Sequence, residues 1–171
     1  MNTLPATTMA EVNLPDPILI EISLVLDYSG SMRDNDKYIR MTAAARDFIT
    51  KVATDRGDRS KIGIVPFSEY VHATVPGGMI RGTPAGDANT PMTTCLLNRD
   101  YPYSAGDSTP SSSIDASRWP QVELSDPKCQ EYADGNLAVR DLTNDFTSLN
   151  DALSDMEPTG LTNIALASEM G

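Results

Sequence analysis

The hydrophobic and polar positions along the chain follow two different periods, which predict strands and helices in succession. Residues 18–26 read ILIEISLVL, a nearly continuous β-branched and leucine run of the kind that forms a strand buried on both faces. We therefore predict that this segment is the central strand of a sheet. Over residues 37–53 apolar side chains recur at spacings of three and four, as on one face of an amphipathic helix. We expect Asn35 or Asp36 to cap this helix and Gly57 to end it.

Two further apolar segments follow closely on one another. Residues 61–67 (KIGIVPF) and 71–75 (VHATV) both read as strands, and only three residues separate them. Such a short link permits an antiparallel hairpin and excludes a parallel crossover, so we predict a hairpin. Pro66 lacks the N–H that a ladder uses, which places it at a bulge or on an edge. A strand, a loop and a helix followed by more strands indicate an α/β fold.

Residues 76–136 differ in character from the segments on either side. They are crowded with Pro, Gly, Ser, Thr, Asn and Asp, and we interpret them as a polar insertion in the fold. The helical spacing of apolar residues returns at 142–156, where Pro158 stops it. A further helix is expected to begin at Asn163.

Length and composition indicate one globular domain. The chain has 171 residues, of which 40% are hydrophobic and 22% charged, and we divide it into a linker at 1–17 and one domain at 18–171. There are 13 Lys and Arg against 24 Asp and Glu, a formal charge of -11, so nucleic acid is not an expected partner. No apolar run approaches the roughly 20 residues that span a bilayer. We therefore expect no membrane contact within the chain, and any anchor or export signal would lie outside it.

The two cysteines, Cys95 and Cys129, lie in the polar stretch without CxxC spacing, and His72 is the single histidine. This pattern argues against a zinc site. We predict a disulfide that closes the insertion and contributes roughly 3 to 4 kcal/mol in the chain-entropy model, so that reduction should loosen the residues between the two cysteines far more than the α/β core. Two unpaired thiols remain the alternative, because the sequence does not prove an oxidising compartment. His72 reads as a structural residue on a strand face, since no partner acid or nucleophile lies nearby in sequence.

One short motif carries recognisable chemistry. Asp27, Ser29 and Ser31 form the pattern D-x-S-x-S directly after a buried strand, where open α/β sheets place their ligands. Three hard oxygen atoms at alternate positions can converge on one side of a tight loop, with Gly30 supplying backbone freedom. Such ligands suit Mg²⁺, Mn²⁺ or Ca²⁺. The alternative is a polar turn that caps the next helix, and the pattern alone does not decide between the two.

The whole string LVLDYSGSM resembles the metal-ion-dependent adhesion site of von Willebrand factor A domains. The resemblance implies a three-layer, doubly wound, Rossmann-like α/β fold with one antiparallel edge strand. It also implies a threonine in a later loop as a fourth metal ligand, and GLTNI places Thr162 in the matching position. The alternative for Thr162 is a simple helix N-cap.

The family pattern includes a second aspartate at the end of a later strand, which this sequence does not reach. The resemblance therefore implies a C-terminally truncated domain, for which we expect weak Mg²⁺ binding and self-association through an exposed apolar flank of the sheet. The order of LVLDYSGSM, GDRSKIGIVPFSEYV, a cysteine-bearing insertion and GLTNIALASEMG is similar to the A domains of TadG-like proteins of tight-adherence (Flp-type) pilus assembly. Such domains are held outside the cytoplasm by a membrane segment, which implies the periplasm or cell surface here.

These features together predict a non-catalytic, metal-dependent protein-binding module of adhesion type in a bacterial envelope or pilus-assembly protein. Mg²⁺, or alternatively Mn²⁺ or Ca²⁺, would be held by Asp27, Ser29, Ser31 and Thr162 and would coordinate an acidic group of a protein partner. One rival is an intracellular module of the same fold that works with an AAA-type ATPase. The other is a phosphohydrolase of haloacid dehalogenase type, which fits less well because such enzymes place a second aspartate where this chain has Ser29.

Overall fold

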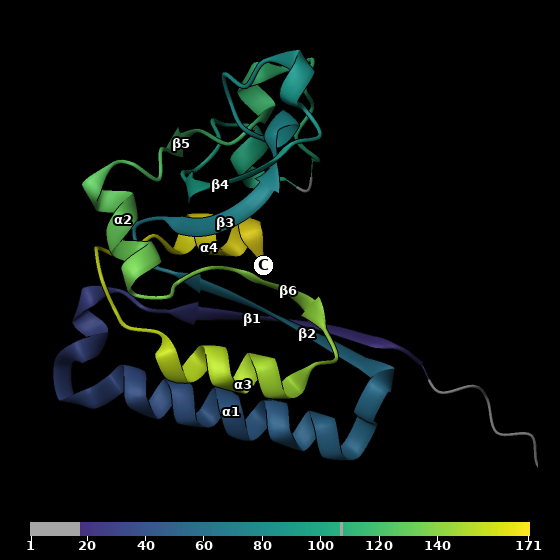
Figure 1. The fold of residues 1–171 in the computed structure, drawn as a ribbon, viewed down its shortest axis with the longest axis vertical. Helices are drawn as coiled ribbons and strands as arrows, with labels where there is room; N and C mark the ends of the chain where they lie inside the picture. The colour runs from purple at the N-terminus through teal and green to yellow at the C-terminus, as the bar shows by residue number, and fades with distance from the viewer. Residues whose placement is uncertain (1–17, 107) are drawn as a thin grey trace, which may run out of the picture.

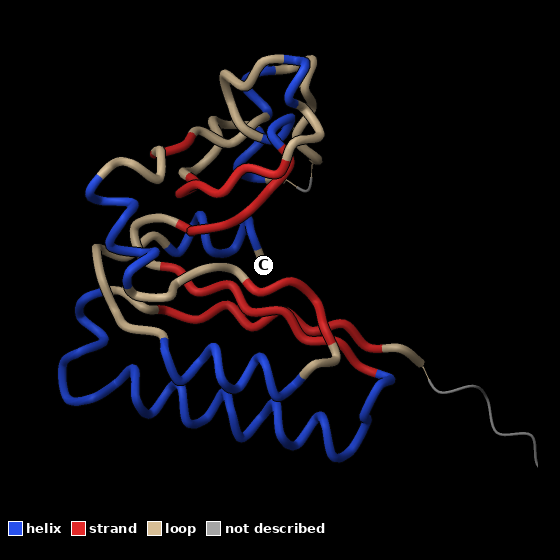
Figure 2. The backbone as a smooth tube through the Cα atoms, in the orientation of Figure 1, coloured by secondary structure: helices blue, strands red, loops and turns tan. Residues whose placement is uncertain are grey.

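The computed structural model describes residues 18–106 and 108–171, so the predicted linker at 1–17 lies outside the described residues. Within them the chain is a mixed α/β fold with two three-stranded sheets and four α-helices. Figures 1 and 2 show two long helices on one face of the first sheet, and the second sheet with the short last helix on the other. The α/β class predicted from the sequence is confirmed.

The first sheet consists of β1 (Ile20–Asp27), β2 (Ser60–Phe67) and β6 (Arg140–Thr143), in the order β1-β2-β6. β2 runs parallel to β1 and antiparallel to β6. Every residue of β2 except Lys61 is buried, whereas half-buried and exposed positions alternate along most of β1. The prediction that residues 18–26 form the central strand is therefore wrong. β2 is central in the described sheet, and the polar residues within the first apolar run give β1 a solvent-facing side.

The second sheet consists of β3 (Val71–Pro76), β4 (Pro91–Leu96) and β5 (Gln121–Val122), in the antiparallel order β3-β4-β5. The predicted hairpin between 61–67 and 71–75 is wrong, because the three-residue link carries the chain from one sheet to the other. An antiparallel strand does lie at the edge of the first sheet, but it is β6. Pro66 pairs with Leu26 of β1 beyond the last pair between β2 and β6, where its missing N–H interrupts no bond to β6.

The helices cover both faces of the first sheet: α1 (Lys37–Arg56) and α3 (Phe146–Asp155) lie on one, and α4 (Ile164–Met170) on the other. Gly57 follows α1 as predicted, with a φ of 57° that favours glycine. Asp36 stands at the N-cap of α1, but its side chain makes no capping hydrogen bond. The helix predicted over 142–156 begins later, because Leu142 belongs to β6. The predicted helix start at Asn163 is confirmed.

The predicted insertion at 76–136 is folded, although it is polar. It contains β4, β5 and α2 (Pro127–Asp134). Short 3-10 helices fill connections here and elsewhere: η1 (Gly30–Asp36), η2 (Gly57–Arg59), η3 (Gly77–Met79), η4 (Ala85–Asp87), η5 (Tyr103–Ala105) and η6 (Asp115–Ser117). Hydrogen-bonded turns thus replace the long structureless loop that the composition alone would allow.

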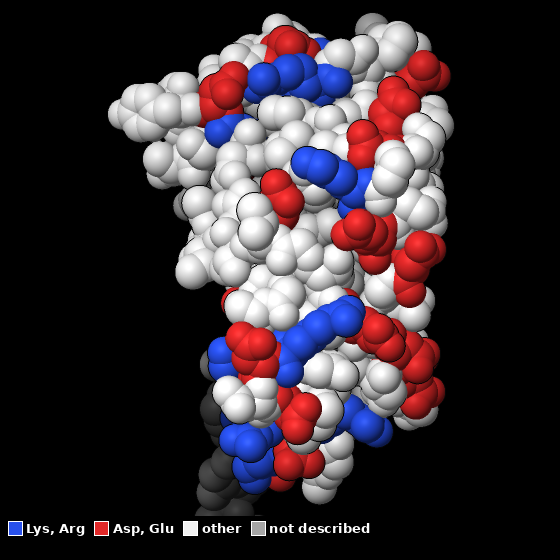
Figure 3. All heavy atoms as spheres, turned by 90° about the vertical axis from the view of Figure 1, so that its left-hand side faces the viewer, with Lys and Arg blue, Asp and Glu red and all other residues white. Residues whose placement is uncertain are grey.

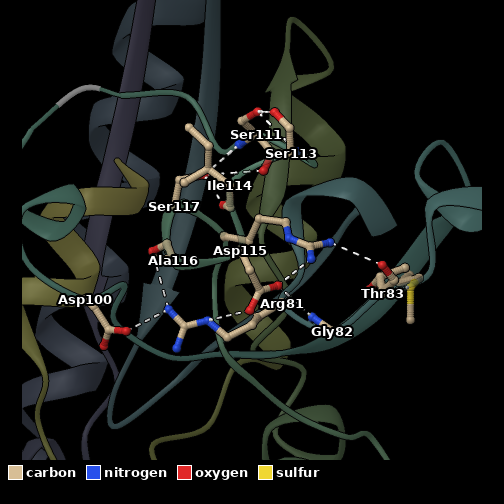
Figure 4. A network of polar contacts seen from close by, with 12 residues as sticks. Arg81, Gly82, Thr83, Asp100, Ser111, Ser113, Ile114, Asp115, Ala116 and Ser117 are labelled. Carbon is tan, nitrogen blue, oxygen red and sulfur yellow. Dashed lines mark hydrogen bonds and ion pairs between the residues drawn. The ribbon is translucent and has the colours of Figure 1, made fainter.

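Polar contacts centred on Asp115 hold much of this insertion together (Figure 4). The Gly82 N–H donates to Asp115 Oδ1 at 3.3 Å, Arg118 forms an ion pair with the same carboxylate, and Arg81 lies 3.9 Å from its other oxygen. The Gly82 hydrogen bond and the Arg118 guanidinium lower the pKa of Asp115. This network supplies order in a stretch that has few apolar side chains for a core.

Two hydrophobic clusters lie on the two faces of the first sheet. Ile62 and Ile64 of β2 belong to the cluster beneath α1 and α3. Val65 and Phe67 of the same strand belong to the other cluster, which also includes Leu166 of α4 and residues of the second sheet. β2 therefore contributes side chains to both cores, which explains its nearly complete burial.

Cys95 of β4 and Cys129 of α2 form a disulfide with Cα atoms 5.6 Å apart, which confirms the predicted pairing. Both residues are fully buried in the cluster that also contains the core of α1 and α3. The crosslink thus ties α2 and the second sheet to the main core and does not merely close a surface loop. A buried disulfide is consistent with an oxidising compartment outside the cytoplasm. Among the described residues, no helix combines the length and apolar character needed to cross a membrane.

Replacing both Cys95 and Cys129 by alanine should lower the free energy of unfolding by roughly 3 to 4 kcal/mol, because the crosslink joins residues 34 apart in sequence. Since both cysteines lie in the core, hydrogen-exchange protection should fall in α2 and β4 and not only in the loop between them. Urea unfolding and exchange measured on the two proteins check this. Free thiols in the native protein, or equal protection of α2 and β4, would contradict it.

His72 of β3 is buried, and neither of its ring nitrogens has a hydrogen-bond partner among the described residues. Burial, with the nearby charge of Arg140, lowers its pKa below the ordinary 6.5. Between these two pKa values the unfolded chain binds a proton that the folded chain does not bind. The stability that depends on neutral His72 is therefore present above about pH 6.5 and is lost as the pH falls.

We accordingly expect the unfolding free energy of the wild type to decrease as the pH falls below about 6.5, and His72→Leu to reduce that slope. Urea titrations of both proteins at several pH values measure the two slopes. A variant with the same pH dependence as the wild type would show that acid destabilisation has another source.

Candidate metal centre

The D-x-S-x-S motif folds into a tight loop at the carboxyl end of β1. Asp27 is the last residue of that strand, and its Oδ1 accepts the N–H of Ser29 at 2.8 Å. The Oγ atoms of Ser29 and Ser31 lie 3.3 Å apart and hydrogen-bond to each other. Ser29 stands at the N-cap position of η1, yet its side chain makes no capping bond. The two hydroxyls therefore converge beside Asp27 in a polar turn, and Ser29 does not cap η1.

Buried contacts hold one side of this loop, and its other side is accessible to solvent. Tyr28 is fully buried, its N–H donates to Phe67 O at 2.8 Å, and its hydroxyl lies 2.9 Å from Thr42 Oγ1 of α1. Burial raises the pKa of Tyr28, so its hydroxyl stays protonated and available for this hydrogen bond. Ser29 is also buried, whereas Ser31 is exposed. Ser31 thus marks the side from which solvent or a partner reaches the loop.

A second loop, between α3 and α4, lies against the first. The Gly30 N–H donates to Gly160 O at 2.9 Å, and the Thr159 N–H donates to Tyr28 O at 2.8 Å. A Cβ atom on Gly30 would lie 3.1 Å from Gly160 O, so the close backbone approach favours glycine here. Thr162 belongs to this second loop and is exposed. The structure thus brings the segment that carries Thr162 alongside the motif loop.

The interpretation of Thr162 as a helix N-cap is wrong. The cap of α4 is Asn163, whose Oδ1 accepts the N–H of Leu166 at 3.2 Å. The Thr162 hydroxyl is therefore not needed to begin α4.

A further contact between the two loops comes from Arg33 in η1, whose guanidinium donates to Pro158 O at 2.6 and 3.1 Å.

The predicted ligands Asp27, Ser29, Ser31 and Thr162 carry one carboxylate and three hydroxyls, and the hydrogen bonds of the described residues join the first three but not the Thr162 hydroxyl. This donor set suits Mg²⁺, Mn²⁺ or Ca²⁺, and the convergence of the two serine hydroxyls fits a shared ion. Among the described residues, no group of three or more His, Cys, Asp or Glu side chains gathers into a cluster of metal ligands. A metal site on these loops would thus rely on hydroxyls around a single carboxylate.

Sequence reasoning missed the residues that support the second loop. Ser68, in the link between β2 and β3, lies with its Oγ 2.6 Å from the hydroxyl of Tyr132 in α2. The Ser68 carbonyl accepts the N–H of Asn163 at 2.7 Å. No local pattern could have found these contacts, because they join segments far apart in the chain. The one available signal was the start of α4 at Asn163.

Trp119 and its neighbours form a buried cluster away from this site. The Arg99 guanidinium carbon lies 5.1 Å from the centre of the Trp119 ring, and Trp119 Nε1 donates to Glu169 Oε1 at 3.0 Å. Arg99 and Glu169 also form a buried ion pair. These contacts connect the insertion to α4, so Trp119 packs beneath the insertion, whereas Tyr101 is 84% exposed.

Figure 3 views the molecule from the side on which β1 and β2 end, the same side as α2 and the two loops. On this face Asp and Glu side chains gather along one edge, and Lys and Arg are interspersed among acidic groups. With a formal charge of -11, the chain offers no continuous basic surface on this face for an anionic polymer.

Comparisons of the chain with models of protein families, with curated proteins and with solved structures found no match. The interpretation of the site therefore depends on the residues and contacts described above.

Gly160→Ala should destabilise the second loop. Gly160 has a φ of 66°, and an added Cβ would lie 2.5 Å from the Tyr132 hydroxyl and 2.7 Å from Ser68 Oγ. We expect the free energy of unfolding to fall by more than about 1 kcal/mol, since alanine is strained at positive φ. Gly86→Ala is the matched control, because its added methyl would meet nothing within 4 Å. Equal urea midpoints for the two variants would contradict the prediction.

Proposed function

We propose that the chain is a metal-dependent protein-binding module with a von Willebrand factor A fold, most similar to the A domains of TadG-like pilus-assembly proteins. The observation that carries the proposal is the meeting of two loops at the end of β1. The Ser29 and Ser31 hydroxyls lie 3.3 Å apart beside Asp27, and the loop with Thr162 is joined to the same turn through Gly30.

The arrangement of the first sheet supports this fold assignment. A parallel pair of strands with an antiparallel strand at the edge, and helices on both faces, is what the resemblance implies. The motif lies at the carboxyl end of a strand of this sheet, where open α/β folds bind ligands. In this assignment the second sheet and α2 are an addition to the von Willebrand factor A fold.

In this function Asp27, Ser29, Ser31 and Thr162 would hold the divalent cation, which supplies an electrophilic centre with an open coordination position. Because Asp27 is the single carboxylate among these ligands, half of the positive charge of the divalent ion would remain uncompensated. A carboxylate of a partner protein is a natural ligand for such a centre. The chain itself carries a formal charge of -11 and would on average repel an acidic partner, so the bound ion would supply the local attraction. Binding should therefore depend on the metal.

The buried disulfide supports a location outside the cytoplasm, in the periplasm or at the cell surface. It favours the envelope module over an intracellular module that works with an AAA-type ATPase. The position two residues after Asp27, where a phosphohydrolase of haloacid dehalogenase type has its acid, is the buried Ser29. A serine there cannot protonate a leaving group in that way.

Asp27→Ala should abolish binding of Mg²⁺ and Mn²⁺ while leaving the fold intact, because it removes the only charged group of the proposed site. Calorimetric titration with each ion measures binding, and thermal unfolding reports on the fold. The matched control is Asp47→Ala, which removes an exposed carboxylate from α1 and should bind both ions as the wild type does. If Asp27→Ala still binds Mn²⁺ with wild-type affinity, these residues are not the metal site.

An assay with p-nitrophenyl phosphate and a simple ester separates the binding module from the enzyme alternative. We expect no turnover with or without Mg²⁺. Turnover by the wild type that Asp27→Ala abolishes would contradict the proposed function and favour a phosphohydrolase.

A further inference from the structure

Tyr132 in α2 is 2% exposed, and its hydroxyl lies between the β2–β3 link and the loop that precedes α4. The backbone N–H groups of Glu69 and Tyr70 both donate to it, at 3.0 and 3.2 Å, and Ser68 Oγ lies 2.6 Å away. The Tyr132 and Ser68 hydroxyls hydrogen-bond to each other, and the Glu69 N–H is shared with Ser68 Oγ, to which it donates at 2.6 Å. One hydroxyl therefore holds all three residues of the link.

The link in turn holds the second loop of the site. Ser68 O accepts the Asn163 N–H at 2.7 Å, and Glu69 O accepts Asn163 Nδ2 at 3.3 Å. At the other end of the loop, Gly160 packs so closely on the hydroxyl that a Cβ there would lie 2.5 Å from it. Gly160 O accepts the N–H of Gly30, between the two serines of the motif. The threonine of the proposed site lies between these two fixed points.

α2 and the turn after it hydrogen-bond to the same loop at two further places. Thr159 Oγ1 donates to Glu131 Oε2 at 3.0 Å, and the Glu157 N–H donates to Gly135 O at 3.0 Å. These contacts run along the loop from the end of α3 towards the site. The position of α2 therefore sets the position of the loop.

The disulfide anchors α2. Cys129 lies one helical turn before Tyr132, so the two side chains share a face of the helix. That face is buried in the core, where Cys129 is bonded to Cys95 and the Tyr132 ring lies 5.4 Å from that of Tyr70. A helix of eight residues has little stability of its own, so its placement depends on such tertiary contacts.

We propose that Tyr132 is a positioning residue of the metal site. Its hydroxyl, on a helix anchored by the Cys95–Cys129 disulfide, sets the approach of the loop with Thr162 to the Asp27–Ser31 loop. The proposal rests on the proposed function, since it assigns a divalent cation to these two loops. Contacts that orient metal ligands commonly change metal affinity about 10- to 100-fold when they are removed.

Tyr132→Phe, which removes only the hydroxyl, is the test on the full chain. We expect calorimetric titration to show Mn²⁺ affinity at least about tenfold below that of the wild type. In the absence of metal, amide exchange at Gly30 and Asn163 should become faster, because the Gly30 N–H joins the two loops through Gly160 O and the Asn163 N–H joins the second loop to Ser68 O of the link. Ile49→Val, which removes one methylene from the buried face of α1, is the control for a general loss of stability. It should lower the unfolding midpoint without changing Mn²⁺ affinity or those two exchange rates.

Replacing Cys95 and Cys129 together by alanine tests the anchor independently, and it should lower Mn²⁺ affinity and protection at Gly30 and Asn163 in the same direction. Equal Mn²⁺ affinity of Tyr132→Phe and the wild type would overturn the positioning role while leaving the proposed function intact. A wild type that binds no Mn²⁺ would refute the proposed function itself. Unchanged exchange at Gly30 and Asn163 in Tyr132→Phe would overturn the positioning role whatever the wild type binds.

Discussion

The burial of β2 on both faces is the constraint on which the rest of the fold depends. Ile62 and Ile64 enter the core beneath α1 and α3, whereas Val65 and Phe67 enter the core shared by α4 and the second sheet. Each fully buried side chain of this size contributes about 1.5 to 3 kcal/mol. β1 is aligned by its parallel ladder with β2, so the position of Asp27 at the strand end follows from the packing of its neighbour.

The elements of the fold were largely predictable, but their pairing was not. Apolar runs located β1, β2 and β3, and helical spacing located α1 and α3, because these signals are local in sequence. The predicted hairpin between β2 and β3 was wrong because a short link permits two strands to pair antiparallel but does not require them to pair. β4 pairs with β3 from within the polar insertion, and its neighbour α2 is fixed by a disulfide, which no periodicity reveals.

In the candidate site, too, local features were predictable and long-range contacts were not. The convergence of Ser29 and Ser31 beside Asp27 could be predicted, since three alternate residues in one tight turn depend on local backbone geometry alone. The support of the second loop could not. Tyr132 has no feature in the sequence that distinguishes it from other tyrosines, and its importance comes from meeting Ser68 across the fold. Side chains that orient a site from behind are visible only once distant segments are in place.

The complete burial of both cysteines has a kinetic consequence. Thiol–disulfide exchange begins with attack of a thiolate on one sulfur, and exclusion of solvent from Cys95 and Cys129 keeps such a thiolate away while the core is closed. The crosslink should therefore survive transient exposure to reducing conditions, and its rate of reduction would report how often α2 separates from β4. The folded core shields the bond, and the bond keeps α2 against the core.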